Sequence, residues 1–139
     1  MQIDGTEQPQ DPLEAGEFIR VTKMSPEDRF EYFLQHLKDY PFFYGLFGKN
    51  GWIMVQSDDE LCLPIWSHQD FVVAWERDDF PECLPKRIEL QEFAEIWVPG
   101  LEKNNTLVLI FPCGDEEEGI VMSGNEILEC IKEVVPTLS

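Results

Sequence analysis

The sequence predicts one α/β domain of the α+β kind, in which helices pack against a mixed β-sheet of about six strands. The expected order of elements is α-β-β-β-α-β-α-β-β-α. Residues 61–75 and 87–97 indicate this fold, because each reads as a short strand that runs into a short helix. Each helix carries Phe and Trp four residues apart, on one face: Phe71 with Trp75, and Phe93 with Trp97. These four residues and Leu109 are expected to be mostly buried.

The chain is expected to divide into an arm and a domain. Residues 1–24 are polar, contain Pro9 and Pro12, and predict a flexible acidic arm. Within the arm, residues 18–21 are expected either to form a short strand or to pack onto the core. Residues 25–139 are expected to form a single globular domain, since 139 residues with 43% hydrophobic content suffice for one core.

The first predicted helix starts at Ser25, which can cap it, with Pro26 suited to the first turn. Its apolar stripe ends before Pro41. Strands are then expected at 43–47 and 52–55, joined through Asn50-Gly51, a strong hairpin signal.

Residues 61–66 predict an interior strand that is apolar on both faces. Pro64 suggests a strand end or a bulge there. The next helix is expected to start with Ser67 as its N-cap, with Asp70 at its third helical position.

The second half of the chain repeats the strand–helix pattern. A short strand at 87–89 leads into a helix that Pro99-Gly100 is expected to break. Residues 107–111 predict a fully buried strand, and residues 120–122 are expected to pair back onto it. Ser123 and Glu126 have the spacing of a capping box for the last helix, which Pro136 ends.

The net charge of −18, from 28 acidic and 10 basic residues, limits the function classes. Nucleic-acid binding is excluded, because it needs a basic surface that neutralises phosphates. An anionic membrane would also repel the chain. A basic partner protein would be attracted over long range, whereas the alternative interpretation is that the charge only maintains solubility. No signal peptide is visible and the longest apolar run, 107–111, is too short to span a bilayer, so a cytoplasmic location is expected.

The four cysteines lack the spacing of zinc ligands and are expected to be reduced and mostly buried: Cys62, Cys83, Cys113 and Cys130. No phosphate loop or hydrolase motif is present, and no cofactor, metal or catalytic residue is predicted.

The acidic residues of three connections are the predicted partner-binding residues: Asp58, Asp59 and Glu60; Asp78, Asp79 and Glu82; and Asp115, Glu116, Glu117 and Glu118. Each cluster equally fits a solvated surface turn, and the last lacks the alternating ligands of a calcium loop.

An alternative site is a ligand cleft near Trp66, His68 and Asp70. Trp66 ends a strand where a cleft could open, and Asp70 could orient a catalytic His68. The plainer interpretation is that His68 lies at the surface near a helix cap and that the tryptophans belong to the core. His36 is expected to be exposed.

Several segments between Phe30 and about Leu128 resemble the bacterial domain-of-unknown-function family numbered 2750. The resemblance rests on residues 44–47, 51–52, 63–68, 71, 74–75, 88–93, 97–101 and 111–112. It implies a small bacterial cytoplasmic domain but no activity and no catalytic residue. Residues 63–75 and 107–128 are more weakly similar to the N-terminal domain of the type III secretion enhancer SseB family, which implies the fold only.

Two function classes therefore remain. The first is a protein-binding module, such as an immunity protein that neutralises a basic partner. The second is a small ligand-binding domain or enzyme that uses Trp66, His68 and Asp70. An enzyme is the less favoured of the two.

Overall fold

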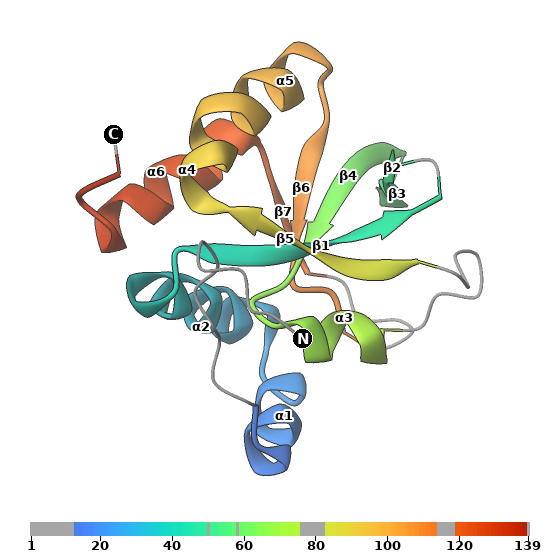
Figure 1. The fold of residues 1–139 in the computed structure, drawn as a ribbon, viewed down its shortest axis with the longest axis vertical. Coiled ribbons are helices and arrows are strands. Elements are labelled where there is room, and N and C mark those ends of the chain that lie inside the picture. Colours follow the sequence, from blue (N-terminus) through green and yellow to red (C-terminus); the bar gives the residue numbers. More distant parts are fainter. Residues whose placement is uncertain (1–12, 50, 58, 76–82, 114–118, 139) are drawn as a thin grey trace, which may run out of the picture.

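The computed structural model describes residues 13–49, 51–57, 59–75, 83–113 and 119–138 (Figure 1). The elements follow one another as α1 (Ala15–Thr22), α2 (Pro26–Asp39), β1 (Phe42–Gly48), β2 (Gly51–Trp52), β3 (Val55–Ser57), β4 (Glu60–Ile65), α3 (Gln69–Ala74), β5 (Leu84–Glu89), α4 (Leu90–Glu92), a π-helical turn η1 (Phe93–Trp97), α5 (Val98–Lys103), β6 (Leu107–Ile110), β7 (Ile120–Met122) and α6 (Gly124–Val134). The predicted α+β class and single domain are confirmed.

Within the described residues, the strands form two sheets rather than the single sheet expected. An antiparallel sheet has the order β2-β1-β5, and a mixed sheet has the order β3-β4-β6-β7 with β4 and β6 parallel. The predicted strand at 52–55 is divided between them. The chain turns at Ile53, whose N–H donates to Leu46 O at 2.8 Å, so that β2 ends on the first sheet and β3 begins on the second.

The two sheets meet at one bridge between β1 and β4. Tyr44 and Trp66 exchange backbone hydrogen bonds of 2.8 and 2.9 Å. This junction also explains why Pro64 is tolerated inside β4. Backbone N–H groups two residues apart point to the same side of a strand. The Pro64 nitrogen therefore points to the same side as the Trp66 nitrogen, which is the side away from β6. On that side β3 has already ended, because its last pair is Val55 with Cys62. The missing N–H therefore costs no ladder hydrogen bond.

Helices cover the sheets on two sides. In Figure 1, α2 and α3 lie below the first sheet, α1 lies lowest, and α4, α5 and α6 lie above. A line of rings links the two sides. Phe43 of β1 lies 5.5 Å from the Phe33 ring of α2 and 5.1 Å from the Phe93 ring of η1. This core fixes both helix layers relative to β1.

The N-terminal arm expected at 1–24 contains a helix. Residues 1–12 lie outside the described part of the chain, but α1 occupies Ala15–Thr22. The short strand suggested at 18–21 is therefore wrong, whereas packing of these residues onto the core is confirmed by Val21, which is buried.

The expected break at Pro99-Gly100 is also wrong, because α4, η1 and α5 form one continuous helical segment, 90–103. The Val98 N–H reaches back five residues to Phe93 O. This π-helical turn widens the helix just before Pro99, which lies in the first turn of α5. Leu101 remains on the buried face.

The predicted helix starts hold at two of three positions. The Ser25 side chain accepts the Asp28 N–H, and Ser123 and Glu126 form the predicted capping box. The third start is wrong by one residue, since α3 begins at Gln69 with His68, and not Ser67, as its N-cap. Ser67 precedes the N-cap, and its hydroxyl lies 2.8 Å from Nδ1 of the His68 ring.

The predicted core is confirmed at Phe71, Phe93 and Leu109. Trp75 and Trp97 are mostly buried as expected, but they keep some exposed surface and pack on the core from its edge. The thiols of Cys62, Cys83 and Cys113 are buried as expected, and that of Cys130 is half-buried.

Candidate functional site

Helix α1 is held against α3 by its apolar face. The Phe18 ring stacks on the Phe71 ring of α3 with centroids 5.2 Å apart. Phe71 in turn contacts Phe111, at 4.8 Å, and so is fixed from the core side. Val21, three residues after Phe18, is fully buried. Together these contacts attach one face of α1 to the rest of the domain, and a groove remains between α1 and α3.

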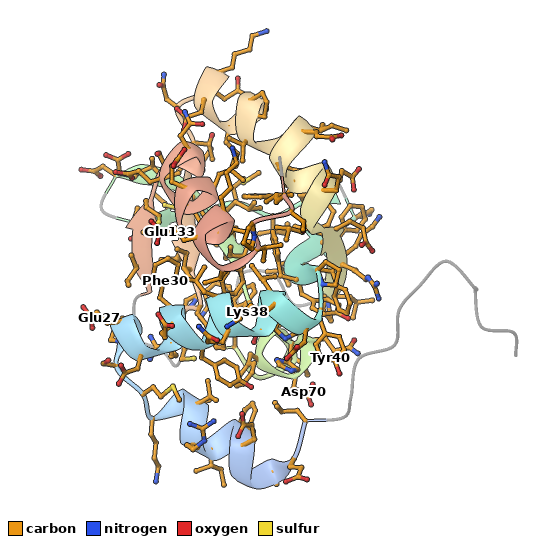
Figure 2. The ribbon with its side chains drawn as sticks, turned by 90° about the vertical axis from the view of Figure 1, so that its left-hand side faces the viewer. Glu27, Phe30, Lys38, Tyr40, Asp70 and Glu133 are labelled. Atoms are coloured by element: carbon orange, nitrogen blue, oxygen red, sulfur yellow. The ribbon has the colours of Figure 1, made fainter. Side chains whose placement is uncertain are left out.

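This groove has a volume of about 660 Å³ and is lined by Leu13, Ala15, Phe18, Ile19, Gln69, Asp70 and Val73. Ile19 and Val73 line it from different helices, although 52% and 61% of their surfaces are exposed. Asp70 is exposed on the side of α3 that faces α1 (Figure 2). The groove is therefore apolar with one carboxylate at its edge, a combination suited to an apolar group with a nearby positive charge.

Two buried histidines lie behind this groove. The rings of His36 and His68 have centroids 4.8 Å apart, and His68 also contacts the Phe71 ring that supports α1. Both are buried, so the expected surface positions are wrong. His68 turns inward because its N-cap backbone is extended and its ring finds the Ser67 hydroxyl at 2.8 Å. His36 turns inward because Phe42 O, at 3.2 Å from its Nε2, offers an acceptor.

Burial keeps both imidazoles neutral near pH 7. Desolvation first, and the neighbouring His68 second, lower the pKa of His36 to about 4, although its hydrogen bond to Phe42 acts the other way. Burial also lowers the pKa of His68, against the pull of the Asp70 and Glu17 carboxylates. A carbonyl only accepts, so the single proton of neutral His36 lies on Nε2.

A polar link joins α1 to α2 above the histidines. Glu17 forms an ion pair with Arg20 at 2.9 Å, and this partner lowers the pKa of the Glu17 carboxyl. Burial, followed by a hydrogen bond to Glu17, raises the pKa of Tyr32 well above its ordinary value. The Tyr32 ring lies 6.1 Å from the His68 ring. The same side chains therefore position α1 and enclose the histidine pair.

The structure does not bring the predicted cleft residues to one opening. Trp66 has no exposed surface, and its indole N–H donates to Pro112 O at 2.8 Å. Ser67 and His68 are buried beside it. Asp70 alone reaches the groove. The Trp66 side chain contacts the sheet and Trp75, and a ligand cleft at Trp66, His68 and Asp70 stays a prediction.

Of the predicted partner-binding acids, Asp59 and Glu60 are described, and both are exposed, Asp59 in the turn before β4 and Glu60 at its first position. The remaining eight lie outside the described residues: Asp58, Asp78, Asp79, Glu82, Asp115, Glu116, Glu117 and Glu118. In the part of the chain that the structure describes, no three His, Cys, Asp or Glu side chains are grouped closely enough to hold a metal ion. No described helix is long and apolar enough to cross a membrane.

Sequence reasoning missed the groove residues of α1 and the inward turn of His36. The available signal was the spacing of Phe18 and Val21, three residues apart, which suits one helix face as well as a strand. No local pattern signals that α1 and α3 lie side by side, because that contact depends on rings brought together by the whole fold.

Fold and site thus define a small α+β domain with an apolar groove and a buried histidine pair, without an accessible catalytic constellation in its described part. The chain belongs to the family described as Protein of unknown function (DUF2750), whose model matches residues 30–131. The predicted family is therefore confirmed, and α1, which supplies Ala15, Phe18 and Ile19 to the groove, lies outside the match. A comparison with curated proteins found no match. The similarity to the SseB family stays a prediction.

Proposed function

We propose that the chain is a protein-binding module that takes a basic, amphipathic segment of a partner protein into the groove between α1 and α3. The observation that carries the proposal is the exposure of Ile19 and Val73, two branched aliphatic side chains that line one groove from two helices. A helix with apolar residues every three or four positions fits such a groove.

The charge of the chain supports a basic partner. The net charge is −18, Asp70 lies at the groove, and Glu14 lies exposed between the lining residues Leu13 and Ala15. Such a field accelerates association with a positively charged protein and disfavours acidic competitors. The acidic connections, including Asp59 and Glu60, add to it over a screening length of about 8 Å at physiological ionic strength. An immunity-type role, in which an acidic cytoplasmic domain neutralises a basic toxin, belongs to this proposal.

A designed peptide tests the groove. The probe is a fluorescent helical peptide of about 15 residues with Leu at positions i, i+4, i+7 and i+11 and Lys or Arg elsewhere. A matched peptide carries Glu in place of each basic residue. We expect the basic peptide to bind in an anisotropy titration, with an association rate that falls steeply as salt rises, and the acidic peptide not to bind.

Two matched variants locate the binding. Ile19→Lys places a cation in the groove and should weaken binding at least about tenfold, which is about 1.4 kcal/mol. Ile96→Lys makes the same change at a residue of η1 that is 64% exposed and is not among the groove residues, and should leave binding unchanged. Asp70→Asn should mainly slow association. Equal effects of the two lysine variants, or equal binding of the acidic peptide, would refute the proposal.

A further inference from the structure

A second surface is built on the first sheet, away from the groove. The strand register makes Phe47 a cross-strand neighbour of both Trp52 and Leu84, and such neighbours project from the same face of a sheet. The rings of Phe47 and Trp52 are half-buried, and 67% of Leu84 is exposed. Helix η1 covers the other end of this face through Phe93 on Phe43. The end of the sheet that carries Phe47, Trp52 and Leu84 is therefore an aromatic surface open to solvent.

The rings of this surface are held in fixed orientations. Trp52 lies edge-on to Phe47, with centroids 5.1 Å apart and planes at 81°, and edge-on to Trp97, at 4.8 Å and 82°. Below Trp52 the chain has Gly45, where a Cβ would lie 3.1 Å from Cζ3 of the indole. The absence of a side chain at Gly45 thus lets the indole lie close to the sheet. We call Phe47, Trp52 and Trp97 the aromatic platform.

A cation already occupies the platform. The Lys86 ammonium lies 4.1 Å from the centroid of Phe47 and 5.6 Å from that of Trp52. The side chain is exposed, in a chain with 28 acidic residues, yet among the described residues no carboxylate forms an ion pair with it. Its neighbour Arg87, by contrast, pairs with Glu89. The rings therefore attract an ammonium that forms no ion pair with a described carboxylate.

We propose that the aromatic platform is a binding site for a lysine or arginine side chain of a basic partner protein, and that Lys86 occupies it until the partner displaces it. Rigid rings at right angles present both a face and an edge, and a cation over such faces gains attraction without losing its contact with water. The net charge of −18 draws a basic protein to this surface. The proposal shares its class of partner with the proposed function, but it uses other residues on other elements and does not require the groove.

Removing Lys86 should open the site. Only molecules in which Lys86 has left the rings can bind a partner's cation. The apparent affinity of the wild type for that cation is therefore lower than the affinity of an uncovered platform. The variant Lys86→Met keeps the length of the side chain and removes its charge. We expect it to bind a cationic probe about two- to fivefold more tightly than the wild type, the range that an exposed cation–π contact contributes. The variant Phe47→Leu keeps apolar bulk without the ring and should weaken binding by a similar factor.

The test is an NMR titration with a short capped peptide, acetyl-Gly-Lys-Gly-Lys-Gly-amide. It has no apolar side chain for the groove, so a failure of the groove proposal would not affect the result. We expect the indole N–H signals of Trp52 and Trp97 to move, that of buried Trp66 to stay, and the Lys86 εCH₂ protons to lose their ring-current shift as the peptide displaces them. An uncharged peptide with acetylated lysines serves as the control and should produce none of these changes.

Three results would overturn the proposal. The first is a titration in which the Trp52 signal stays in place while the peptide binds elsewhere. The second is unchanged affinity in both Lys86→Met and Phe47→Leu, which would indicate a diffuse attraction to the acidic surface. The third is binding of tetramethylammonium chloride without binding of the peptide, which would assign the platform to small ammonium compounds. The wild-type titration and Lys86→Met keep the test decisive even if Phe47→Leu does not fold.

Discussion

Single residues hold this fold where backbone or rings approach closely, and Gly119 is the tightest case. A Cβ built on it would lie 1.8 Å from Ile110 O, well inside any allowed contact. We expect Gly119→Ala to lower the free energy of unfolding by more than about 2 kcal/mol, because β7 must shift away from β6. Urea unfolding followed by tryptophan fluorescence measures the change.

The matched control is Gly16→Ala in α1. No atom lies within 4 Å of the added Cβ there, and the position is helical, so stability should stay unchanged or rise by up to about 1 kcal/mol. If both alanine variants were equally stable, β6 and β7 would not approach as closely as described.

The histidine pair predicts an acid-sensitive fold. The folded state lowers the pKa of His36 from 6.5 to about 4, so the neutral ring stabilises the fold above pH 6.5. As pH falls from 6.5 to 4, the unfolded chain binds this proton first and the stabilisation is lost. At about 1.4 kcal/mol for each pH unit, the loss is about 3 kcal/mol at most.

Comparison with His36→Phe isolates this effect from the titration of the acidic residues. Phe keeps the ring packing but carries no proton. We expect the free energy of unfolding of the wild type, relative to that of the variant, to decrease between pH 6.5 and 4. Parallel pH profiles of the two proteins would show that His36 is not buried in its neutral form.

At the scale of elements, α1 should detach independently of the rest. It is attached through Phe18 and Val21 and belongs to neither sheet. We expect Phe18→Ala to cost about 1–2 kcal/mol and to accelerate hydrogen exchange in α1, whereas amides shared by β1 and β5 keep their protection. Ile19→Ala, at an exposed neighbour, should change stability by less than about 0.5 kcal/mol. Protected α1 amides in Phe18→Ala would contradict this attachment.

The elements that the sequence predicts well are those with local signals. The Ser25 and Ser123 caps, together with apolar stripes, define α2 and α6, and the Asn50-Gly51 pair marks the return from β1 to β2. The helix break expected at Pro99 is wrong, because a proline usually ends an ordinary helix, whereas here it follows a π-helical turn and the helix continues. The local residues fit both a helix break and a continuous helix, and only the packing of the whole segment decides between the two.

The candidate site was predicted at one residue, Asp70, and missed elsewhere for a physical reason. A groove between two helices exists only after a distant pair of rings, Phe18 and Phe71, has met. His36 and His68 illustrate the same limit. They are 32 positions apart in the sequence and look exposed one at a time, yet each provides part of the cover that buries the other.

For the whole molecule, the charge predicts a response to salt. With a net charge of −18, repulsion within the folded state exceeds the gain from exposed ion pairs such as Arg20 with Glu17. We expect the melting temperature at pH 7.5 to rise as sodium chloride shortens the screening length from about 30 Å to about 8 Å. An equal concentration of uncharged sucrose should not reproduce this steep low-salt rise. A melting temperature that falls with salt would mean that attractive pairs dominate.

The parallel pairing of β4 with β6 has a consequence for the time during which the protein is made. Cys62 pairs with Leu107, which a ribosome adds 45 residues later, or about 2–9 seconds at ordinary elongation rates. Throughout that interval Leu63 and Ile65, which have no exposed surface in the finished fold, have no neighbouring strand on that side. The first sheet is delayed in the same way, because Phe42 of β1 pairs with Glu89 of β5, which is synthesised later. The nascent chain therefore carries β4 without its β6 neighbour while 45 of its 139 residues are added, and we expect its yield in the cell to depend on chaperones that cover such strands until β6 emerges.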